Sequence, residues 1–204
     1  MIFFTTFVQE QTVRKLTHEE IASQRSGKEE IKIKPRLPLF VVVDNVRSLY
    51  NVGSIFRSSD GALIQKLYLC GFTPYPPRKE IEKTALGATE SVPWEYRESP
   101  VDVIKELKAQ GIKICLLEQT NQSVPYYSIK LSDFPLCLVI GNELTGVSKQ
   151  VIDLADMAIE IPMFGIKQSL NVAVAYGIAI YTFVHILTQN GQTPTASYPY
   201  ESVK

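Results

Sequence analysis

Polar side chains that could take part in chemistry gather in three segments near the predicted ends of strands. These segments are Asn51–Ser58, Gly141–Val147 and Ile161–Val172. They contribute amide, guanidinium, carboxylate and hydroxyl groups, on Asn51, Arg57, Glu143, Ser169 and Asn171. Such groups bind anions, orient substrate hydroxyls and stabilise charge that develops during a reaction. Each segment also has an ordinary interpretation, as a helix cap with a solvated arginine, as a plain loop, and as a second helix cap at Ser169.

Several common kinds of site are missing from the sequence. The chain has neither the glycine-rich dinucleotide fingerprint nor the phosphate-binding loop pattern. Its two histidines, His18 and His185, are too far apart in different settings to suggest a triad or a zinc site. Each of the three cysteines, Cys70, Cys115 and Cys137, lies inside an apolar run. We therefore expect buried thiols in a reducing cytoplasmic protein and no metal site.

The elements that would position the polar segments alternate between strand and helix. Apolar runs predict strands at 39–43, 66–70, 112–117, 136–140 and 158–162, and caps and periodicity predict helices at 51–62, 100–110, 148–155 and 170–188. This order indicates an α/β fold with a mostly parallel sheet covered by helices on both faces. Ligands of such sheets bind at the carboxyl ends of strands, which points to the loops that begin at Asp44, Gly71, Glu118, Gly141 and Pro162.

Length and charge limit the organisation of the chain. With 204 residues, 22.9 kDa and 21 basic residues against 21 acidic ones, one compact domain with a short arm is expected. We divide the chain into an N-terminal arm at 1–37, a main domain at 38–190 and a tail at 191–204. Thr17 and Glu20 have capping-box spacing, so the arm should contain a helix that ends near Gly27. Zero net charge still allows a nucleic-acid partner, because a local basic patch is sufficient.

A long stretch without charge lies between Lys167 and Glu201. Within it, Leu170–Leu187 is 18 residues long and apolar, which is the minimum length for a membrane span. Asn171, Gly177 and His185 interrupt the run, and no basic cluster follows it, so we expect a fully buried helix and no membrane contact. Asn171 would be an amide inside that helix, and a buried amide favours a place facing a pocket or an interface.

Taken together, the three polar segments resemble the signature motifs of the SpoU/TrmH-type RNA 2′-O-ribose methyltransferases of the SPOUT superfamily. The first is similar to N-x-G-x-x-x-R, with Asn51, Gly53 and Arg57. The second is similar to G-x-E-x-x-G, from Gly141 to Gly146. The third is similar to I-P-M-x-G-x-x-x-S-L-N-V-x-x-A, which begins at Ile161. The resemblance covers residues 38–188.

This resemblance implies a fold, a cofactor and a partner. The expected fold has a C-terminal trefoil knot that binds S-adenosylmethionine largely through backbone groups. The implied cofactor residues are Gly141, Ile161, Met163, Leu170 and Leu117, with Glu118 as a further candidate. Members of the family are homodimers, and the small residues of the last helix, such as Ala173 and Gly177, would allow close approach of a second copy.

The implied activity is methyl transfer to a ribose 2′-hydroxyl of tRNA or rRNA. Arg57 would hold a phosphate and stabilise the developing alkoxide, while Glu143 would orient Arg57 or the ribose. Ser169 and Asn171 would bind the substrate and Arg57, with Asn51 supporting them. The alternative function is a non-catalytic RNA-binding protein that keeps the fold. RNA contacts are expected from basic residues of the arm and from the loops around Arg47, Arg78, Lys79 and Lys83, and Trp94 and Tyr96 could stack on bases.

Overall fold

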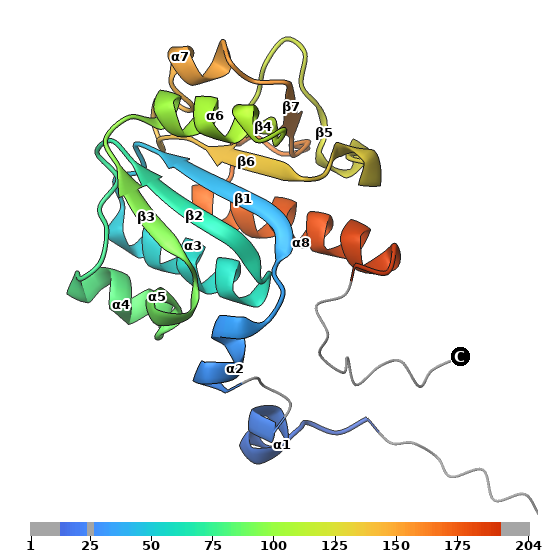
Figure 1. Ribbon diagram of the computed structural model, residues 1–204. Helices are drawn as coiled ribbons and strands as arrows, with labels where there is room; N and C mark the ends of the chain where they lie inside the picture. Colours follow the sequence, from blue (N-terminus) through green and yellow to red (C-terminus); the bar gives the residue numbers. More distant parts are fainter. Residues whose placement is uncertain (1–12, 24–26, 193–204) are drawn as a thin grey trace, which may run out of the picture.

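The structure is a computed structural model and describes residues 13–23 and 27–192. It contains a short arm followed by one α/β domain (Figure 1). The elements are α1 (His18–Ser23), α2 (Lys28–Ile33), β1 (Leu37–Asp44), α3 (Leu49–Gly61), β2 (Ile64–Cys70), α4 (Lys79–Ala85), α5 (Ala88–Ser91), β3 (Trp94–Arg97), α6 (Pro100–Ala109), β4 (Lys113–Leu117), β5 (Val124–Pro125), β6 (Leu136–Ile140), α7 (Lys149–Ile152), β7 (Met157–Glu160) and α8 (Val172–Gln189). Two 3-10 turns, Tyr126–Ser128 and Leu131–Asp133, lie between β5 and β6.

All neighbouring strands of the sheet run parallel, as the sequence predicts. The seven strands lie in the order β3-β2-β1-β6-β4-β7-β5. The five predicted strands are present with ends shifted by up to two residues. The edge strands β3 and β5 were not predicted, because β5 has two residues and β3 carries Glu95 and Arg97 in place of an apolar run. The parallel arrangement brings the carboxyl ends of all seven strands to one edge.

Helices cover both faces of the sheet, with α3, α4, α5 and α8 on one side and α6 and α7 on the other (Figure 1). Successive side chains of β1 point to opposite faces of the sheet. Val41 and Val43 belong to the hydrophobic cluster that includes α3 and α8, and Val42 belongs to the cluster that includes α6. The three cysteines are buried, as expected, and burial raises the pKa of Cys70 and Cys115 to about 12. These thiols are therefore protonated parts of the core.

Several helix starts follow the predicted chemistry. Ser99 caps α6 by accepting a hydrogen bond from the Asp102 amide at 3.2 Å. Thr17 and Glu20 form the expected capping box at α1, which is described as far as Ser23, so its predicted end near Gly27 falls in the segment outside the described residues. Residues 24–26 lie outside the described part of the chain, and α2 follows them. The 148–155 helix is the shorter α7, and the Ser148 hydroxyl at its N-cap makes no capping bond.

The last helix has one buried and one exposed face, so the expectation of a fully buried helix is wrong. Its buried stripe packs against the sheet and consists of Tyr176, Ala179, Ile180, Phe183 and Leu187. Val174 and Tyr181 are 52% and 49% exposed, and His185 is exposed as well. In the part of the chain that the structure describes, α8 is the one helix long and apolar enough to span a membrane. Its buried stripe belongs to the main core of the domain.

Gly53, the glycine of the first polar segment, allows α3 to pack closely on α4. A Cβ at this position would lie 2.0 Å from the Thr84 hydroxyl oxygen and 2.3 Å from the Ile81 carbonyl oxygen. The second atom belongs to the backbone and cannot rotate away. This close approach explains a glycine inside a helix, where it costs about 1 kcal/mol relative to alanine.

We predict that Gly53→Ala lowers the free energy of unfolding by about 2 kcal/mol, because the methyl group forces α3 and α4 apart. Urea unfolding followed by circular dichroism measures the change. Ser58→Ala, which places an alanine elsewhere in the same helix, is the control and should change stability by less than about 1 kcal/mol. Equal effects of the two substitutions would contradict the packing explanation.

Candidate active site

A cavity of about 420 Å³ opens at the carboxyl ends of β4, β6 and β7. Its walls come from the loops after these three strands and from the start of α8. The lining residues are Leu117, Glu118, Gln119, Ile140, Gly141, Asn142, Glu143, Leu144, Gly146, Glu160, Ile161, Met163, Gln168, Ser169, Leu170, Asn171, Val172 and Ala175. The volume lies in the range of small-molecule sites, and the position is the expected one for a parallel sheet.

The wall formed by the loop after β6 needs both of its glycines. Asn142 and Gly146 exchange two backbone hydrogen bonds, of 3.0 and 2.9 Å, which fold this loop back on itself. A Cβ on Gly141 would lie 2.2 Å from the Val147 nitrogen. Gly146 has a positive φ of 68°, and a Cβ there would lie 2.2 Å from a carboxylate oxygen of Glu118. The tight turn exposes the backbone around Gly141 to the cavity.

The Glu143 carboxylate holds the N-terminus of α3. One oxygen accepts a hydrogen bond from the Arg47 amide at 3.1 Å, and the other accepts from the Ser48 amide at 3.2 Å and the Asn51 side chain at 3.0 Å. Partial burial raises the pKa of Glu143, but these hydrogen bonds outweigh that effect and lower it below the ordinary value of 4.5. A carboxylate near a helix N-terminus is also favoured by the helix dipole.

Asn171 is the N-cap of α8 and not a residue inside it. Its side-chain oxygen accepts hydrogen bonds from the Ala173 and Val174 amides at 2.9 and 3.3 Å. Its amide nitrogen donates to the side-chain oxygen of Asn51 at 3.0 Å. The prediction of Ser169 as the N-cap is therefore wrong, because the chain turns helical only after Asn171. Both Ser169 and Asn171 are exposed and line the cavity.

The sequence-predicted residues converge on this cavity with two exceptions. All five predicted cofactor residues line it, as do Glu143, Ser169 and Asn171. Asn51 lies beside it, hydrogen-bonded to both Glu143 and Asn171. Arg57 lies further along α3, is exposed and does not line the cavity of its own chain. In the described part of the chain, its guanidinium makes no hydrogen bond or ion pair with another side chain.

Three positioning residues were not among the predicted site residues. Asp44 is fully buried and accepts hydrogen bonds from the Ser148 amide at 2.8 Å and the Asn45 side chain at 2.7 Å. The Asn142 side chain donates to the Asn45 carbonyl at 2.7 Å. These contacts join the end of β1 to the loop after β6. The one available signal was an acid directly after a buried strand, at a site where the fold places ligands.

Comparison with known proteins agrees with this geometry. The SpoU rRNA Methylase family model matches residues 38–181. A curated tRNA (guanosine(18)-2′-O)-methyltransferase of Aquifex aeolicus is 32% identical over 179 residues, which is 86% of this chain and 82% of the relative. The chain spans about three fifths of several other curated relatives.

Two solved structures are similar in fold. The A. aeolicus TrmH/SpoU tRNA modifying enzyme superposes with a TM-score of 0.74 at 31% identity, over 84% of this chain and 89% of that one. The SpoU methyltransferase AviRb from Streptomyces viridochromogenes, in complex with the cofactor AdoMet, gives 0.67 at 27% identity, over 74% and 58%. The chain belongs to the SpoU rRNA methylase family.

Within the described residues, no group of three or more histidine, cysteine, aspartate or glutamate side chains could hold a metal ion.

We predict that Glu143→Gln destabilises the domain by about 1 kcal/mol at pH 7, because an amide presents an NH₂ group to the N–H donors of α3. Since folding lowers the pKa of Glu143, its contribution is full above the unfolded value of 4.5 and is lost as the pH falls through the folded value. The difference between the two proteins in urea unfolding should therefore narrow below pH 4.5. A difference in unfolding free energy that stays constant as the pH falls below 4.5 would show that the charge of the Glu143 carboxylate does not stabilise the domain.

Proposed function

We propose that this chain is an S-adenosylmethionine-dependent methyltransferase that modifies a ribose 2′-hydroxyl of RNA. The observation that carries this proposal is the convergence of the second and third polar segments on one cavity at the carboxyl edge of the sheet. The first segment is hydrogen-bonded to both of them through Asn51. Membership of the SpoU family and the names of the relatives support the same activity.

The residues of the cavity fit S-adenosylmethionine. Leu117, Ile161 and Leu170 offer apolar walls to a flat adenine ring, and the backbone around Gly141 offers polar groups without a side chain in the way. The carboxylates of Glu118 and Glu160 also line the cavity and complement the positive charges of the sulfonium and ammonium groups. The AdoMet complex of the similar AviRb structure supports this assignment.

When bound, the cofactor would supply a methyl group on a sulfonium: the S–C bond would break as the bond to the ribose 2′-oxygen forms, the sulfur would leave as a neutral thioether, and the hydroxyl proton would pass to solvent water. Ser169 and Asn171 at the cavity mouth would position the ribose for in-line attack. Arg57 would hold the neighbouring phosphate and stabilise the developing alkoxide, because a guanidinium stays protonated in proteins. Glu143 is a poor general base, since its pKa is lowered and both its oxygens hold α3. We assign it a positioning role.

The test combines an activity assay with a binding assay. Purified protein with labelled S-adenosylmethionine should methylate RNA, and mass spectrometry of nuclease digests should locate a 2′-O-methylated nucleotide in tRNA or rRNA. We predict that Arg57→Ala lowers the rate by about 100-fold or more, while calorimetry finds cofactor affinity within about twofold. Arg57→Lys is the charge-conserving control and should retain intermediate activity.

Two outcomes would overturn this assignment. Cofactor binding by the wild-type protein without methyl transfer to any cellular RNA would favour the non-catalytic RNA-binding alternative. Equal loss of activity and cofactor affinity in Arg57→Ala would place Arg57 in the cofactor site. These outcomes are distinct, because the first concerns the wild-type protein and the second only the variant.

We also propose that the protein is a homodimer through the exposed face of α8. Val174, Ile178, Tyr181 and His185 follow one another at helical spacing and form an exposed or half-exposed stripe. An apolar stripe of this kind on a domain surface is typical of an interface. A Cβ on Gly61 of α3 would meet the Tyr181 hydroxyl. Arg57 lies one helical turn before Gly61, so an interface on this stripe would bring Arg57 close to the second copy.

We predict that the double substitution Val174→Asp and Tyr181→Glu converts the dimer to a monomer, because it places two carboxylates in an apolar contact. Light scattering at several concentrations measures the mass. Ile152→Asp adds a charge at a partly exposed apolar position of α7, on the opposite face of the sheet (Figure 1), and should leave the dimer intact. A wild-type monomer would refute the homodimer.

Three further parts of the proposal concern the organisation of the chain. We infer that the segment from Leu117 to Val172 closes a C-terminal trefoil knot, which the family resemblance and the meeting of three loops at one cavity support. A crystal structure traced through this segment tests it. The division into arm, main domain and tail is also part of the proposal, and the family match, which begins at residue 38, supports the start of the main domain. Three buried thiols support a cytoplasmic location, which fractionation would test.

A further inference from the structure

Three aromatic side chains form an exposed group at the carboxyl ends of β2 and β3. Phe72 and Tyr75 lie in the loop after β2, and Tyr96 lies in β3. Phe72 is 79% exposed, Tyr75 43% and Tyr96 37%. The rings of Tyr75 and Tyr96 pack with their centroids 4.5 Å apart, tilted by 38°. We name these three residues the aromatic platform.

The backbone beneath the platform is held firmly although its rings are exposed. The Phe72 amide donates to the Asn45 side chain at 2.9 Å, and the buried Thr73 hydroxyl donates to the Val43 carbonyl at 3.1 Å. The Tyr96 hydroxyl donates to the Gly71 carbonyl at 3.0 Å. Since the loop is already ordered, a partner that stacks on these rings would lose little free energy to ordering them.

The platform is connected to the candidate active site through Asn45. This residue has a positive φ of 60°, holds Phe72 with its side chain and accepts a hydrogen bond from Asn142 at its carbonyl. Gly71 has a φ of 63°, and a Cβ there would lie 2.3 Å from the Asn45 side-chain oxygen. The same asparagine therefore fixes the aromatic loop and the loop that carries Glu143.

Platform and cavity occupy two halves of one sheet edge. β2 and β6 are both neighbours of β1, so the nearest strands of the platform and of the cavity end about 10 Å apart. That distance corresponds to about three stacked nucleotides of a single strand. A strand whose target ribose enters the cavity would thus bring flanking bases to the platform.

The charges around the platform suit a polyanion with bases. Arg78 and Lys79 follow Tyr75 closely, and Arg47 lies between the platform and the cavity; all three side chains are exposed. Glu80 and Glu98 are exposed nearby and oppose them in part. The cation of β3, Arg97, is already paired with Glu95 and Glu106. Aromatic rings with adjacent unpaired cations are the combination that binds single-stranded nucleic acid.

We propose that the aromatic platform binds unpaired nucleotides of the RNA that flank the methylated ribose, by stacking of bases on Phe72, Tyr75 and Tyr96. This inference rests on the proposed function and adds the surface that holds the substrate. The main competing occupant is a second copy of the chain, which would bury the same rings in an interface. RNA is favoured because the adjoining cations would repel the same cations of a second copy.

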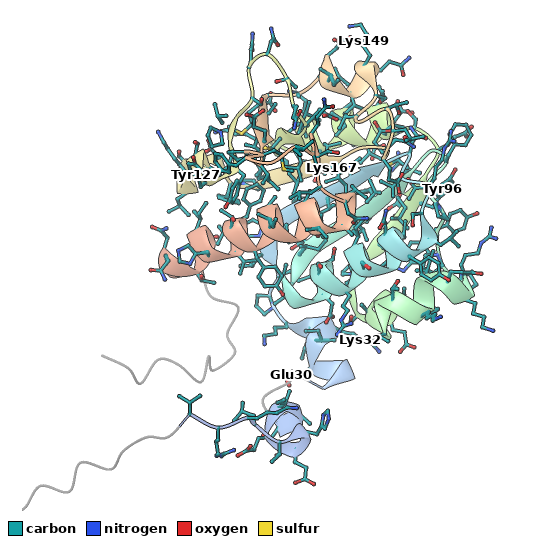
Figure 2. The ribbon with its side chains drawn as sticks, turned by 180° about the vertical axis from the view of Figure 1, so that it is seen from behind. Glu30, Lys32, Tyr96, Tyr127, Lys149 and Lys167 are labelled. Atoms are coloured by element: carbon teal, nitrogen blue, oxygen red, sulfur yellow. The ribbon has the colours of Figure 1, made fainter. Side chains whose placement is uncertain are left out.

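The test measures RNA affinity, cofactor affinity and oligomeric state in the same proteins. We predict that Phe72→Ala weakens RNA binding, and raises the KM for RNA, by about fivefold or more, because a base loses its stacking partner. Phe72→Trp should retain wild-type affinity or exceed it. Tyr127→Ala is the matched control, because Tyr127 is 64% exposed and lies on the opposite side of the molecule from Tyr96 (Figure 2). Cofactor affinity and the unfolding midpoint should be unchanged throughout.

Three results would separate the aromatic platform from the proposed function or from a second copy of the chain. Equal RNA affinity of Phe72→Ala and Tyr127→Ala, in a wild-type protein that methylates RNA, would overturn the platform and leave the proposed function standing. A change in mass by light scattering on Phe72→Ala would assign the rings to a second copy. If the wild-type protein methylates no RNA and Phe72→Ala still weakens RNA binding, the proposed function fails, and the platform stands only as a surface that binds unpaired nucleotides.

Discussion

Glu143 accepts three hydrogen bonds from the start of α3, and the geometry of the site depends on this contact. One of its donors, Asn51, accepts a hydrogen bond from Asn171, which in turn caps α8. A single chain of polar contacts thus joins the loop after β6 to the two long helices that cover one face of the sheet. A carboxylate with all its partners in place is rigid, and its charge offsets the free N–H groups of a helix N-terminus.

Close backbone approach is the second requirement of this site. Gly53 lets α3 pack on α4, and Gly141 and Gly146 let the loop after β6 fold against itself and against Glu118. A side chain at any of these positions would displace a wall of the cavity or the helix that borders it. The cavity can therefore present backbone groups and ordinary apolar residues to a ligand, and it needs no glycine-rich phosphate loop.

The last helix has two stripes, one buried in the core and one exposed at the surface. Tyr176 and Phe183 pack in the core, and the Tyr176 and Ser59 hydroxyl groups share a hydrogen bond of 2.7 Å that joins α8 to α3. The other stripe carries Val174 and Tyr181 at the surface. This division explains a helix apolar on nearly every face in a domain whose core covers only one of them. Arg57 is exposed on α3, one helical turn before Gly61, which lies next to Tyr181, and it does not line the cavity of its own chain. The proposed interface would account for that position.

The sequence by itself determined the alternation of strands and helices, the parallel sheet, the edge where the site lies and half of the residues that line the cavity. Apolar runs, caps and motif spacing are local, so they can be read without knowing the fold. The tertiary structure alone decided that Asn171 caps α8, that Asp44, Asn45 and Asn142 lock two loops together, and that Arg57 stands apart from the cavity. The locking of the two loops depends on contacts between residues about 100 positions apart, Asp44 with Ser148 and Asn45 with Asn142. Their partners are chosen by packing and by hydrogen bonds that no local pattern records.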